Sequence, residues 1–422
     1  MTDGRPRVQG IAYTELAEEF GTPLYVYDDD VLAAQYGTLR AALHPELEFF
    51  YSLKANPNIS VLAALASRGA RAEVCSAAEL LTAVRAGVDP GDIVFVGPGK
   101  SRTELTAALE HGIHAVVCES FDELALLDGL ARARGIPAPV ILRVNPAFSV
   151  KGSRLTMGGR PRQFGMDEEQ LLARPRLAKE FPATRIIGVQ AYMGTRILDA
   201  AVITENTRRI FELAERVGAE LDIPLRTVDV GGGLGIPYFD GEEELDTAEL
   251  AAGLNPVVEE FHTRHPQTRL IMELGRYLTA PAGVYLVRVR YLKTSRGENF
   301  AVVDGGTHHH MAAVGIGSFV KRNFPMRLLG RESSGEPVPW QITGPLCTPN
   351  DTLGKNVPLP PLRTGDLIGV LRSGAYGPTA SPVQFLGHGY PAEVLVRDGR
   401  PHLVRERDRP EDLLARQHLI AP

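Results

Sequence analysis

The stretch 46-ELEFFYSLKANPN-58 begins as an apolar and aromatic run with the alternation of a β-strand, and a lysine follows the run. Ala-Asn-Pro comes directly after Lys54 and marks a turn. A lone lysine at a strand end commonly extends its amine into solvent. The alternative is that the fold places this amine in an active site. The remaining sequence motifs decide between a solvent-exposed amine and an active-site amine.

The apolar run is the first of eight such runs, which alternate with Ala/Leu/Glu/Arg-rich segments of helical period such as Ala200–Val217. The predicted strands are Phe49–Leu53, Ala72–Val74, Ile93–Val96, Ala115–Val117, Val140–Val144, Ile186–Ala191, Thr227–Val230 and Leu270–Glu273. Eight strand–helix units fit an α/β fold of the (β/α)8 TIM-barrel type, which takes about 250 residues. A doubly wound sheet competes, but the count of eight and the lack of an early nucleotide loop favour the barrel. Barrel chemistry lies at the carboxyl ends of the strands, where Lys54 stands.

The residue pattern of the sequence changes after Arg276, from alternating strand and helix patterns to strand patterns alone. The segments 283-GVYLVRVRYLKTS-295 and 299-NFAVVDGG-306 alternate like exposed strands, and glycine and proline punctuate the remainder. This half predicts a second, all-β domain of Greek-key barrel or sandwich type, to which 22-TPLYVYD-28 adds a strand. We expect a barrel over residues 33–277 and a β domain over residues 1–32 plus 278–422.

Composition excludes several classes of protein. The net charge of -6, from 51 acidic and 45 basic side chains, argues against a nucleic-acid binder, which would need a basic face. Cys75, Cys118 and Cys347 match no zinc spacing and suit a reducing cytosol. No apolar run approaches the roughly 18 residues that a membrane helix needs, and the first residues lack a signal core. We expect a cytoplasmic protein with no membrane partner.

Glycines and a carboxylate follow the last two predicted barrel strands. The motif 228-VDVGGGLGIPY-238 holds Gly231, Gly232 and Gly233, whose backbone N–H groups could approach a phosphate. A tight turn or a dinucleotide fingerprint is the alternative. The motif 272-MELGRYL-278 places Glu273 at the barrel mouth, where it needs a cationic or protonated partner, and a simple ion pair with Arg276 is the alternative.

Two loops of the β half contain further candidates. Cys347 lies between prolines in 344-GPLCTPNDTL-353, and Tyr376 lies in a similar loop; for each, a packed side chain is the alternative. The consecutive histidines His308–His310 would point in divergent directions on a strand, so we expect no metal site there.

Taken together, these motifs resemble one family over nearly the whole chain. They are YSLKAN, EVCSAAEL, LRVNP, RQFGM, MGTRI, DVGGGLG, ELGR, GPLCTPND and SGAYG. They are similar to those of the fold-type III decarboxylases that use pyridoxal 5'-phosphate (PLP), the group that includes diaminopimelate and ornithine decarboxylases. The resemblance implies PLP as the cofactor and a homodimer with shared active sites.

The resemblance also implies roles for individual residues. Lys54 would bind PLP covalently, and Cys347 would be the proton donor, supplied by the β domain of the second subunit in a head-to-tail dimer. The implied cofactor contacts are Lys54, Glu73, Arg143, Tyr192, Thr195, Gly231, Gly232, Gly233, Glu273, Leu274, Gly275, Arg276 and Tyr376. The implied substrate contacts are Arg276, Thr348 and Tyr376.

Two of these positions bear on the chemistry. Glu273 would keep the pyridine nitrogen protonated and so favour decarboxylation, whereas alanine racemases place an arginine there. Tyr192 stands where the family usually has a histidine stacked on the ring.

The substrate-binding motifs depart from those of diaminopimelate decarboxylase. Thr348 and Pro349 replace the glutamate after the cysteine, and 304-DGGTHHHMAA-313 lacks the family's arginine. Gln163 replaces the family lysine before Phe164-Gly165, so the resemblance does not carry over an ion pair between that lysine and Asp351 of the other subunit. These segments, with 151-KGSRLTMGGRPRQFGM-166, resemble decarboxylases of secondary metabolism that act on aminoacyl groups tethered to an acyl carrier protein, as in butirosin-type antibiotic pathways; siderophore decarboxylases share part of the pattern.

The resemblance therefore implies α-decarboxylation of a glutamyl- or aspartyl-type unit on a carrier protein. The alternatives are a decarboxylase of free diaminopimelate or of a siderophore intermediate, a cofactor-less regulatory homologue, and a nucleotide-dependent oxidoreductase. Six basic side chains form either a docking rim for an acidic carrier or a solvated face: Lys151, Arg154, Arg160, Arg162, Lys321 and Arg322.

Overall fold

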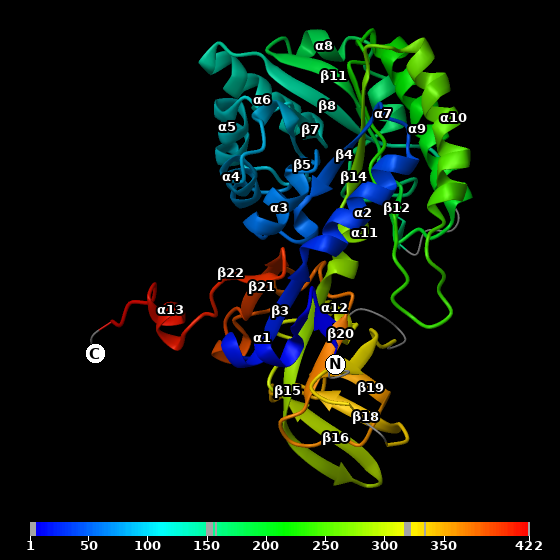
Figure 1. The fold of residues 1–422 in the computed structure, drawn as a ribbon. Helices are drawn as coiled ribbons and strands as arrows, with labels where there is room; N and C mark the ends of the chain where they lie inside the picture. Colours follow the sequence, from blue (N-terminus) through cyan, green and yellow to red (C-terminus); the bar gives the residue numbers. More distant parts are fainter. Residues whose placement is uncertain (1–5, 149–154, 157, 316–321, 333–334, 421–422) are drawn as a thin grey trace. The chain divides into compact units, whose positions relative to one another are not determined.

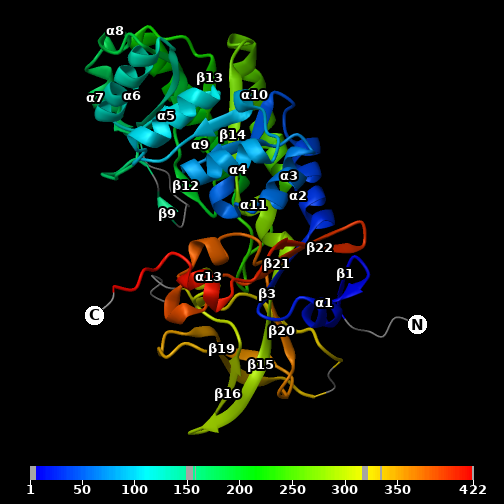
Figure 2. The same ribbon diagram turned by 90° about the vertical axis from the view of Figure 1, so that its left-hand side faces the viewer.

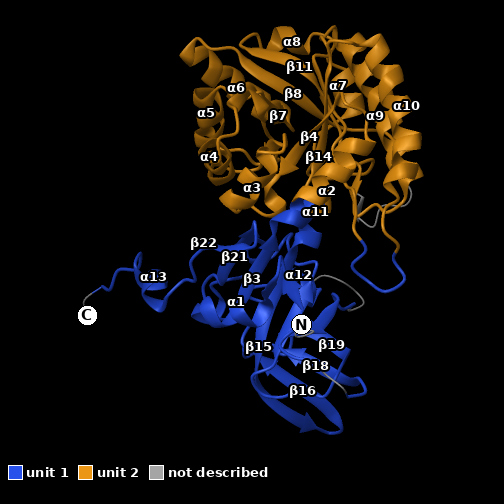
Figure 3. Cartoon of the chain, in the orientation of Figure 1, with its two compact units in different colours: residues 1–32, 237–242, 278–422 blue, residues 33–236, 243–277 orange. Residues whose placement is uncertain are grey.

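The computed structural model describes residues 6–148, 155–156, 158–315, 322–332 and 335–420. The chain forms two compact units, coloured separately in Figure 3. Unit 1 comprises residues 1–32, 237–242 and 278–422, and unit 2 comprises residues 33–236 and 243–277. The short segment 237–242, which the sequence placed with the barrel, groups with unit 1.

Unit 2 is a closed barrel of eight parallel strands, as the sequence predicted. Its strands are β4 (Leu47–Ser52), β5 (Arg71–Val74), β6 (Ile93–Phe95), β7 (Ala115–Cys118), β8 (Ala138–Asn145), β11 (Thr184–Gln190), β13 (Thr227–Asp229) and β14 (Arg269–Leu274). Each strand pairs in parallel with the next, and β14 pairs with β4 to close the ring. The TIM-barrel prediction is confirmed, with strand ends that differ from the expected ones by a few residues.

Helices surround these strands in both views of unit 2 (Figures 1 and 2). They are α2 (Asp29–Ala42), α3 (Ile59–Ala66), α4 (Ala77–Arg85), α5 (Arg102–His111), α6 (Phe121–Arg134), α7 (Glu168–Leu172), α8 (Leu177–Glu180), α9 (Ala200–Leu221) and α10 (Thr247–Arg264). Serines cap several of the helices: the side chains of Ser76, Ser101 and Ser120 each accept a backbone N–H three residues on. The remaining short strands of this unit are β9 (Leu155–Thr156), β10 (Met166–Asp167) and β12 (Gly194–Thr195).

The interior of the barrel is apolar in its body and polar at one end. A fully buried cluster includes Phe50, Val94, Ile141 and Ile271, from four different strands. Strands covered on both faces read as continuous apolar runs, which explains why the sequence revealed them. Charged and amide side chains occur where these strands end, and this placement concentrates the polar groups of unit 2 at the carboxyl edge of the sheet.

Unit 1 is rich in β-structure, as predicted for the second domain. Its strands are β1 (Arg7–Val8), β2 (Ile11–Ala12), β3 (Leu24–Asp28), β15 (Gly283–Ser295), β16 (Glu298–Val303), β17 (Met326–Leu328), β18 (Val338–Thr343), β19 (Thr352–Leu359), β20 (Leu367–Leu371), β21 (Ala392–Arg397) and β22 (Arg400–Arg405). The main sheet runs β19-β18-β16-β15-β3-β21-β22. The N-terminal β3 pairs with β15 and β21, so 22-TPLYVYD-28 joins this unit as expected.

The helices of unit 1 are short: α1 (Tyr13–Glu19), α12 (Met311–Val314) and α13 (Pro410–Leu414), with α11 (Arg276–Thr279) at the junction of the two units in the sequence. Across the part of the chain that the structure describes, no helix combines the length and the apolar character that a membrane crossing requires.

The three consecutive histidines are buried in a turn before α12, not in a strand as the sequence suggested. The exposed fractions of His308, His309 and His310 are 0%, 3% and 0%. The ring centroid of His308 lies 3.9 Å from that of His309 and 4.2 Å from that of His388. Neither ring nitrogen of His308 has a hydrogen-bond partner in the described structure. Among the described residues, no group of three His, Cys, Asp or Glu side chains is arranged to hold a metal ion.

The buried His308 should make the stability of the protein depend on pH. Burial, and then the neighbouring His388, lowers the pKa of His308 to about 3. An unfolded histidine titrates at about 6.5, so between about pH 6.5 and 3 the unfolded chain binds the additional proton. The free energy of unfolding therefore falls as the pH falls through this window, by up to about 1.4 kcal/mol per pH unit from His308.

We expect His308→Phe to reduce this dependence, which denaturant unfolding at pH 7 and pH 5 would measure. His418→Phe is the matched control, because His418 is exposed and should leave the dependence unchanged. Equal pH dependence in His308→Phe and in the unmodified protein would contradict the prediction.

Candidate active site

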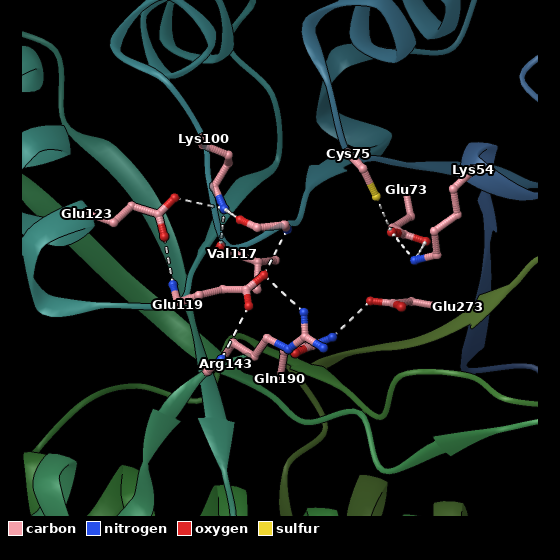
Figure 4. Close-up of polar contacts among 12 residues, drawn as sticks. Lys54, Glu73, Cys75, Lys100, Val117, Glu119, Glu123, Arg143, Gln190 and Glu273 are labelled. Carbon is pink, nitrogen blue, oxygen red and sulfur yellow. Dashed lines mark hydrogen bonds and ion pairs between the residues drawn. The ribbon is translucent and has the colours of Figure 1, made fainter. Parts of the chain in front are cut away.

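Lys54 lies directly after the first barrel strand, in a single 3-10 turn (Leu53–Ala55), and its amine is paired with a buried carboxylate. The Nζ atom lies 2.7 and 3.1 Å from the two carboxylate oxygens of Glu73 (Figure 4). Glu73 is on β5, where Ser52 of β4 is its register partner, and it is fully buried. Burial by itself raises the pKa of Glu73, but the charge and hydrogen bonds of Lys54 lower it overall. The amine is thus held at the carboxyl edge of the barrel.

Two further groups adjoin this pair. The Cys75 thiol donates to Glu73 at 3.2 Å, and the Cys75 backbone N–H donates to the carboxylate of Glu79 at 2.7 Å. Burial raises the pKa of Glu79 to about 7. The segment 73-EVCSAAEL-80 therefore contributes a chain of acidic groups beside Lys54, of which the sequence singled out only Glu73.

A second buried cation, Arg143 on β8, is oriented by Glu119, a residue that the sequence analysis missed. Arg143 Nη1 lies 2.9 Å from Glu119 Oε1, and the two side chains are almost fully buried. Glu119 also accepts the backbone N–H groups of Gly97 and Gly165, at 2.8 and 3.2 Å. Behind it, Lys100 and Glu123 form another buried pair at 2.8 Å (Figure 4). Glu119 thus links the ends of three strands to the loop that holds Gly165.

Glu273 enters the same region from β14. Its Oε1 accepts a hydrogen bond of 3.0 Å from the side-chain amide of Gln190, and Glu273 is 5% exposed. Burial, and then the negative charge of Glu73, raises the pKa of Glu273, while Lys54 and Arg143 act in the opposite direction. Glu273 has no ion-pair partner in the described structure, so the ion pair with Arg276 that the sequence left open is not formed.

The glycine turn after β13 packs its backbone against neighbouring strand ends. Gly231 has a φ of +66°, and a Cβ there would lie 2.6 Å from the ring of Tyr192. A Cβ on Gly232 would overlap the carbonyl oxygen of Glu273. The carbonyl of Gly233 accepts the backbone N–H of Ile197 at 2.9 Å, which joins the turn to the segment that follows β12, the strand that ends at Thr195. Only glycines allow this close approach.

The segment after β14 completes the barrel edge. Leu274 ends the strand and is buried, and Arg276 begins α11. Gly275 lies between them, and a Cβ on it would be 3.0 Å from the side chain of Ala55. The backbone of Gly275 therefore runs beside the turn that holds Lys54.

Three of the predicted site residues lie in unit 1. Cys347 is exposed, Thr348 is half-buried, and Tyr376 has a φ of +54°. The loop of Cys347 is fixed by Asp351, whose carboxylate accepts the backbone N–H groups of Leu346 and Thr307, each at 2.7 Å. The structure thus brings the barrel members of the predicted set together, and it organises the remaining loop within unit 1.

The barrel residues fit PLP by the chemistry of their donors. Lys54 offers an amine for an aldehyde, and the glycine turn offers backbone N–H groups for a phosphate. Glu273 is a buried carboxylate that forms no ion pair among the described residues, and a protonated ring nitrogen would supply a partner.

Comparison with known proteins agrees with this fit. Residues 30–280 match the family model of the pyridoxal-dependent decarboxylases, pyridoxal binding domain. The L-glutamyl-[BtrI acyl-carrier protein] decarboxylase of Niallia circulans is 42% identical over 96% of this chain and 95% of its own length. The diaminopimelate decarboxylase of Pseudomonas aeruginosa is 34% identical over 98% of this chain and 96% of its own length.

Solved structures of diaminopimelate decarboxylases also resemble the whole chain. The diaminopimelate decarboxylase of M. jannaschii in complex with L-lysine superposes with a TM-score of 0.90 at 28% identity, covering 100% of this chain and 97% of the other. That of Helicobacter pylori, also with L-lysine, gives a TM-score of 0.85 at 29% identity, covering 96% and 98%.

Proposed function

The chain belongs to the pyridoxal-dependent decarboxylases, and on that premise we propose that it removes the α-carboxylate of an acidic aminoacyl group carried on an acyl carrier protein. The enzyme is a PLP-dependent decarboxylase. The observation that carries the chemical part of the proposal is the meeting of Lys54, Glu73 and Glu273 at one edge of the barrel, with the Lys54 amine 2.7 Å from Glu73.

The barrel residues would bind the cofactor as follows. Lys54 would hold it through its amine, kept in place by Glu73, and Glu273 would face the ring nitrogen. The phosphate would be bound by the backbone of Gly232, Gly233 and residues 275–276, with Arg143, Tyr192, Thr195 and Leu274 lining the site. Gly231 would shape the turn, because its own N–H already donates to Asp229 at 2.8 Å. When bound, PLP supplies a ring that stabilises the negative charge left at Cα after carbon dioxide departs. A carboxylate at the ring nitrogen favours its protonated form and so supports that role.

We propose that Cys347 returns the proton to Cα, and that it acts in the site of a second copy of the chain arranged head to tail. The exposure of Cys347 and the fixed geometry of its loop support this role, because Asp351 accepts two backbone N–H groups at 2.7 Å and presets the loop. Thr348 and Tyr376, from the same unit, would then contact substrate and cofactor. A preset loop spares the entropy of ordering it on association.

Subunit mixing tests the shared site. Lys54→Ala and Cys347→Ala should each be nearly inactive alone, and mixing them with subunit exchange should restore activity, because mixed dimers contain one intact site. The matched control mixes Lys54→Ala with Glu273→Ala. Both residues belong to the barrel, so each site of the mixed dimer contains one substitution and the mixture should stay inactive. If the first mixture also stays inactive although exchange occurs, Cys347 does not act across subunits.

The tethered substrate is supported by sequence. The relative whose name specifies a glutamyl carrier-protein substrate is 42% identical to this chain, against 34% for the diaminopimelate decarboxylase of P. aeruginosa. Thr348 follows Cys347, and residues 304–315 contain no arginine or lysine. A site for a free diamino acid needs charged groups for the distal end of its substrate. A glutamyl group linked as a thioester through its side-chain carboxyl has no charge at that end and keeps the free α-carboxylate that the reaction removes.

Carbon dioxide release from a glutamyl-loaded carrier protein tests this assignment. We expect kcat/KM for the loaded carrier to exceed that for free glutamate or free diaminopimelate by at least about 100-fold. The reason is that binding energy from contacts with the carrier protein helps to stabilise the transition state at the α-carbon. The three substrates are compared with one enzyme preparation. A matching rate on free diaminopimelate would overturn the tethered-substrate assignment and leave the decarboxylase assignment standing.

Basic residues for carrier docking remain a prediction. Arg160, Arg162 and Arg322 are exposed, and Arg322 lies 3.4 Å from Glu242. Lys151, Arg154 and Lys321 lie outside the described residues.

A further inference from the structure

Asp229 is a fully buried carboxyl group at the end of β13 to which the sequence analysis assigned no role. It is 0% exposed, and its Oδ1 accepts the backbone N–H of Gly231 at 2.8 Å. Its Oδ2 is buried and has no hydrogen-bond partner in the described structure. In the barrel register Gln190 of β11 is its direct partner, and Glu273 extends from the strand on its other side. Asp229 therefore stands between the two side chains that hydrogen-bond each other, Gln190 and Glu273.

The charges around Asp229 disfavour its ionised form. The charged groups that act on it, Glu273 and Glu73, are both acidic, and the backbone N–H of Gly231 opposes them only in part. The cations of the site are bound elsewhere, Lys54 to Glu73 and Arg143 to Glu119. Two carboxylates in one buried site cannot both ionise without a large cost. Burial, and then Glu273, accordingly raises the pKa of Asp229 well above its usual range.

The surroundings also decide which of the two carboxyls holds the proton. Glu273 already accepts the Gln190 amide at 3.0 Å, and Lys54 and Arg143 stabilise its negative charge. Asp229 has one backbone donor, and no cation of the described residues favours its charge. The proton is therefore better placed on Asp229, and Glu273 is the acceptor.

We propose that Asp229 is a neutral carboxylic acid in the folded protein and donates a hydrogen bond to the Glu273 carboxylate, acting as a positioning residue for the group that meets the ring nitrogen of the cofactor. The inference rests on the proposed role of Glu273. Gln190 and Asp229 then hold this carboxylate from two sides, and a neutral Asp229 adds no second negative charge to the barrel mouth.

Cofactor binding to two variants tests the role. Asparagine has the size of aspartate, is neutral at every pH, accepts from Gly231 with its oxygen and donates to Glu273 with its nitrogen. We expect the Kd of Asp229→Asn for PLP to stay within about 3-fold of that of the unmodified protein across pH 6–8. We expect Asp229→Ala to raise the Kd at least about 10-fold, because it loses one hydrogen bond to a charged group. If Asp229→Asn weakens PLP binding as much as Asp229→Ala does, an ionised Asp229 is required and the proposal fails.

Infrared spectroscopy of the cofactor-free protein tests the protonation state directly. At pH 7 the unmodified protein should show the carbonyl stretch of a protonated carboxyl group that shifts when aspartate is labelled with carbon-13, and Asp229→Asn should lack it. The labelling experiment needs no variant and separates the signal of aspartate from that of protonated glutamates such as Glu79. Absence of the shifted band, or its persistence in Asp229→Asn, would overturn the proposal. Neither result depends on whether the enzyme releases carbon dioxide, so failure of the proposed function is distinguishable.

Discussion

Replacing Lys54 by alanine should abolish the visible absorbance of bound PLP and lower turnover by at least about 10³-fold, within the range that a positioned acid–base group contributes. The reason is geometric: the Lys54 amine lies 2.7 Å from Glu73 at the barrel edge, and no other described lysine contacts this carboxylate. Absorbance spectra of the purified protein with added PLP, and carbon dioxide release, measure the two effects.

The alanine variant also leaves Glu73 buried without its cation, which is destabilising in its own right. Lys54→Arg separates the two effects, because a guanidinium keeps the charge near Glu73 but does not form the bond to the cofactor aldehyde. We expect this variant to fold and to remain colourless. Lys179→Ala, at an exposed lysine of α8, is the neutral control. A coloured and active Lys54→Ala would remove Lys54 from the chemistry.

Replacing Cys347 by alanine should leave the absorbance of bound PLP intact and slow turnover by about 10²- to 10⁴-fold, the contribution of a positioned general acid. Its side chain is exposed in a loop that Asp351 fixes, so the change should not disturb the fold. Stopped-flow spectra would show normal substrate binding followed by a slow proton-return step.

Pro349→Ala, at another exposed position of the same loop, should change turnover little. Unchanged turnover in Cys347→Ala would assign the proton to a different group, of which Tyr376 is the first to examine.

The barrel and the position of Lys54 could be predicted because both depend on local sequence. Strands buried on two faces are continuous apolar runs, and a charged residue at the end of such a run is conspicuous. The partners of the site residues could not be predicted in the same way, because they are distant in the chain: Glu119 contacts Arg143 across 24 residues, and Gln190 contacts Glu273 across 83. Glu119, Gln190 and Asp229 share one signal that was available, a polar residue at the end of an apolar barrel strand.

Two features of unit 1 were not found by reasoning from sequence patterns. The histidines looked like strand residues, but the backbone N–H groups of His309 and His310 both bond to the carbonyl of Gly306 at 3.0 Å and form a turn. Asp351 was considered only as a possible partner across subunits. It is 2% exposed and accepts backbone N–H groups from Thr307 and Leu346 of its own chain. Turns and loop anchors depend on backbone hydrogen bonds that residue type alone does not specify.

The central claim is that the amine of Lys54 holds the cofactor in the barrel, and chemical trapping tests it most directly. The purified protein with bound PLP is reduced with borohydride and digested, and the modified peptide is identified by mass spectrometry. We predict one pyridoxyl group per chain, on Lys54 in the peptide that includes 51-YSLKANPN-58. A pyridoxyl group on Lys100 or any other lysine, or no stable modification at all, would contradict the account.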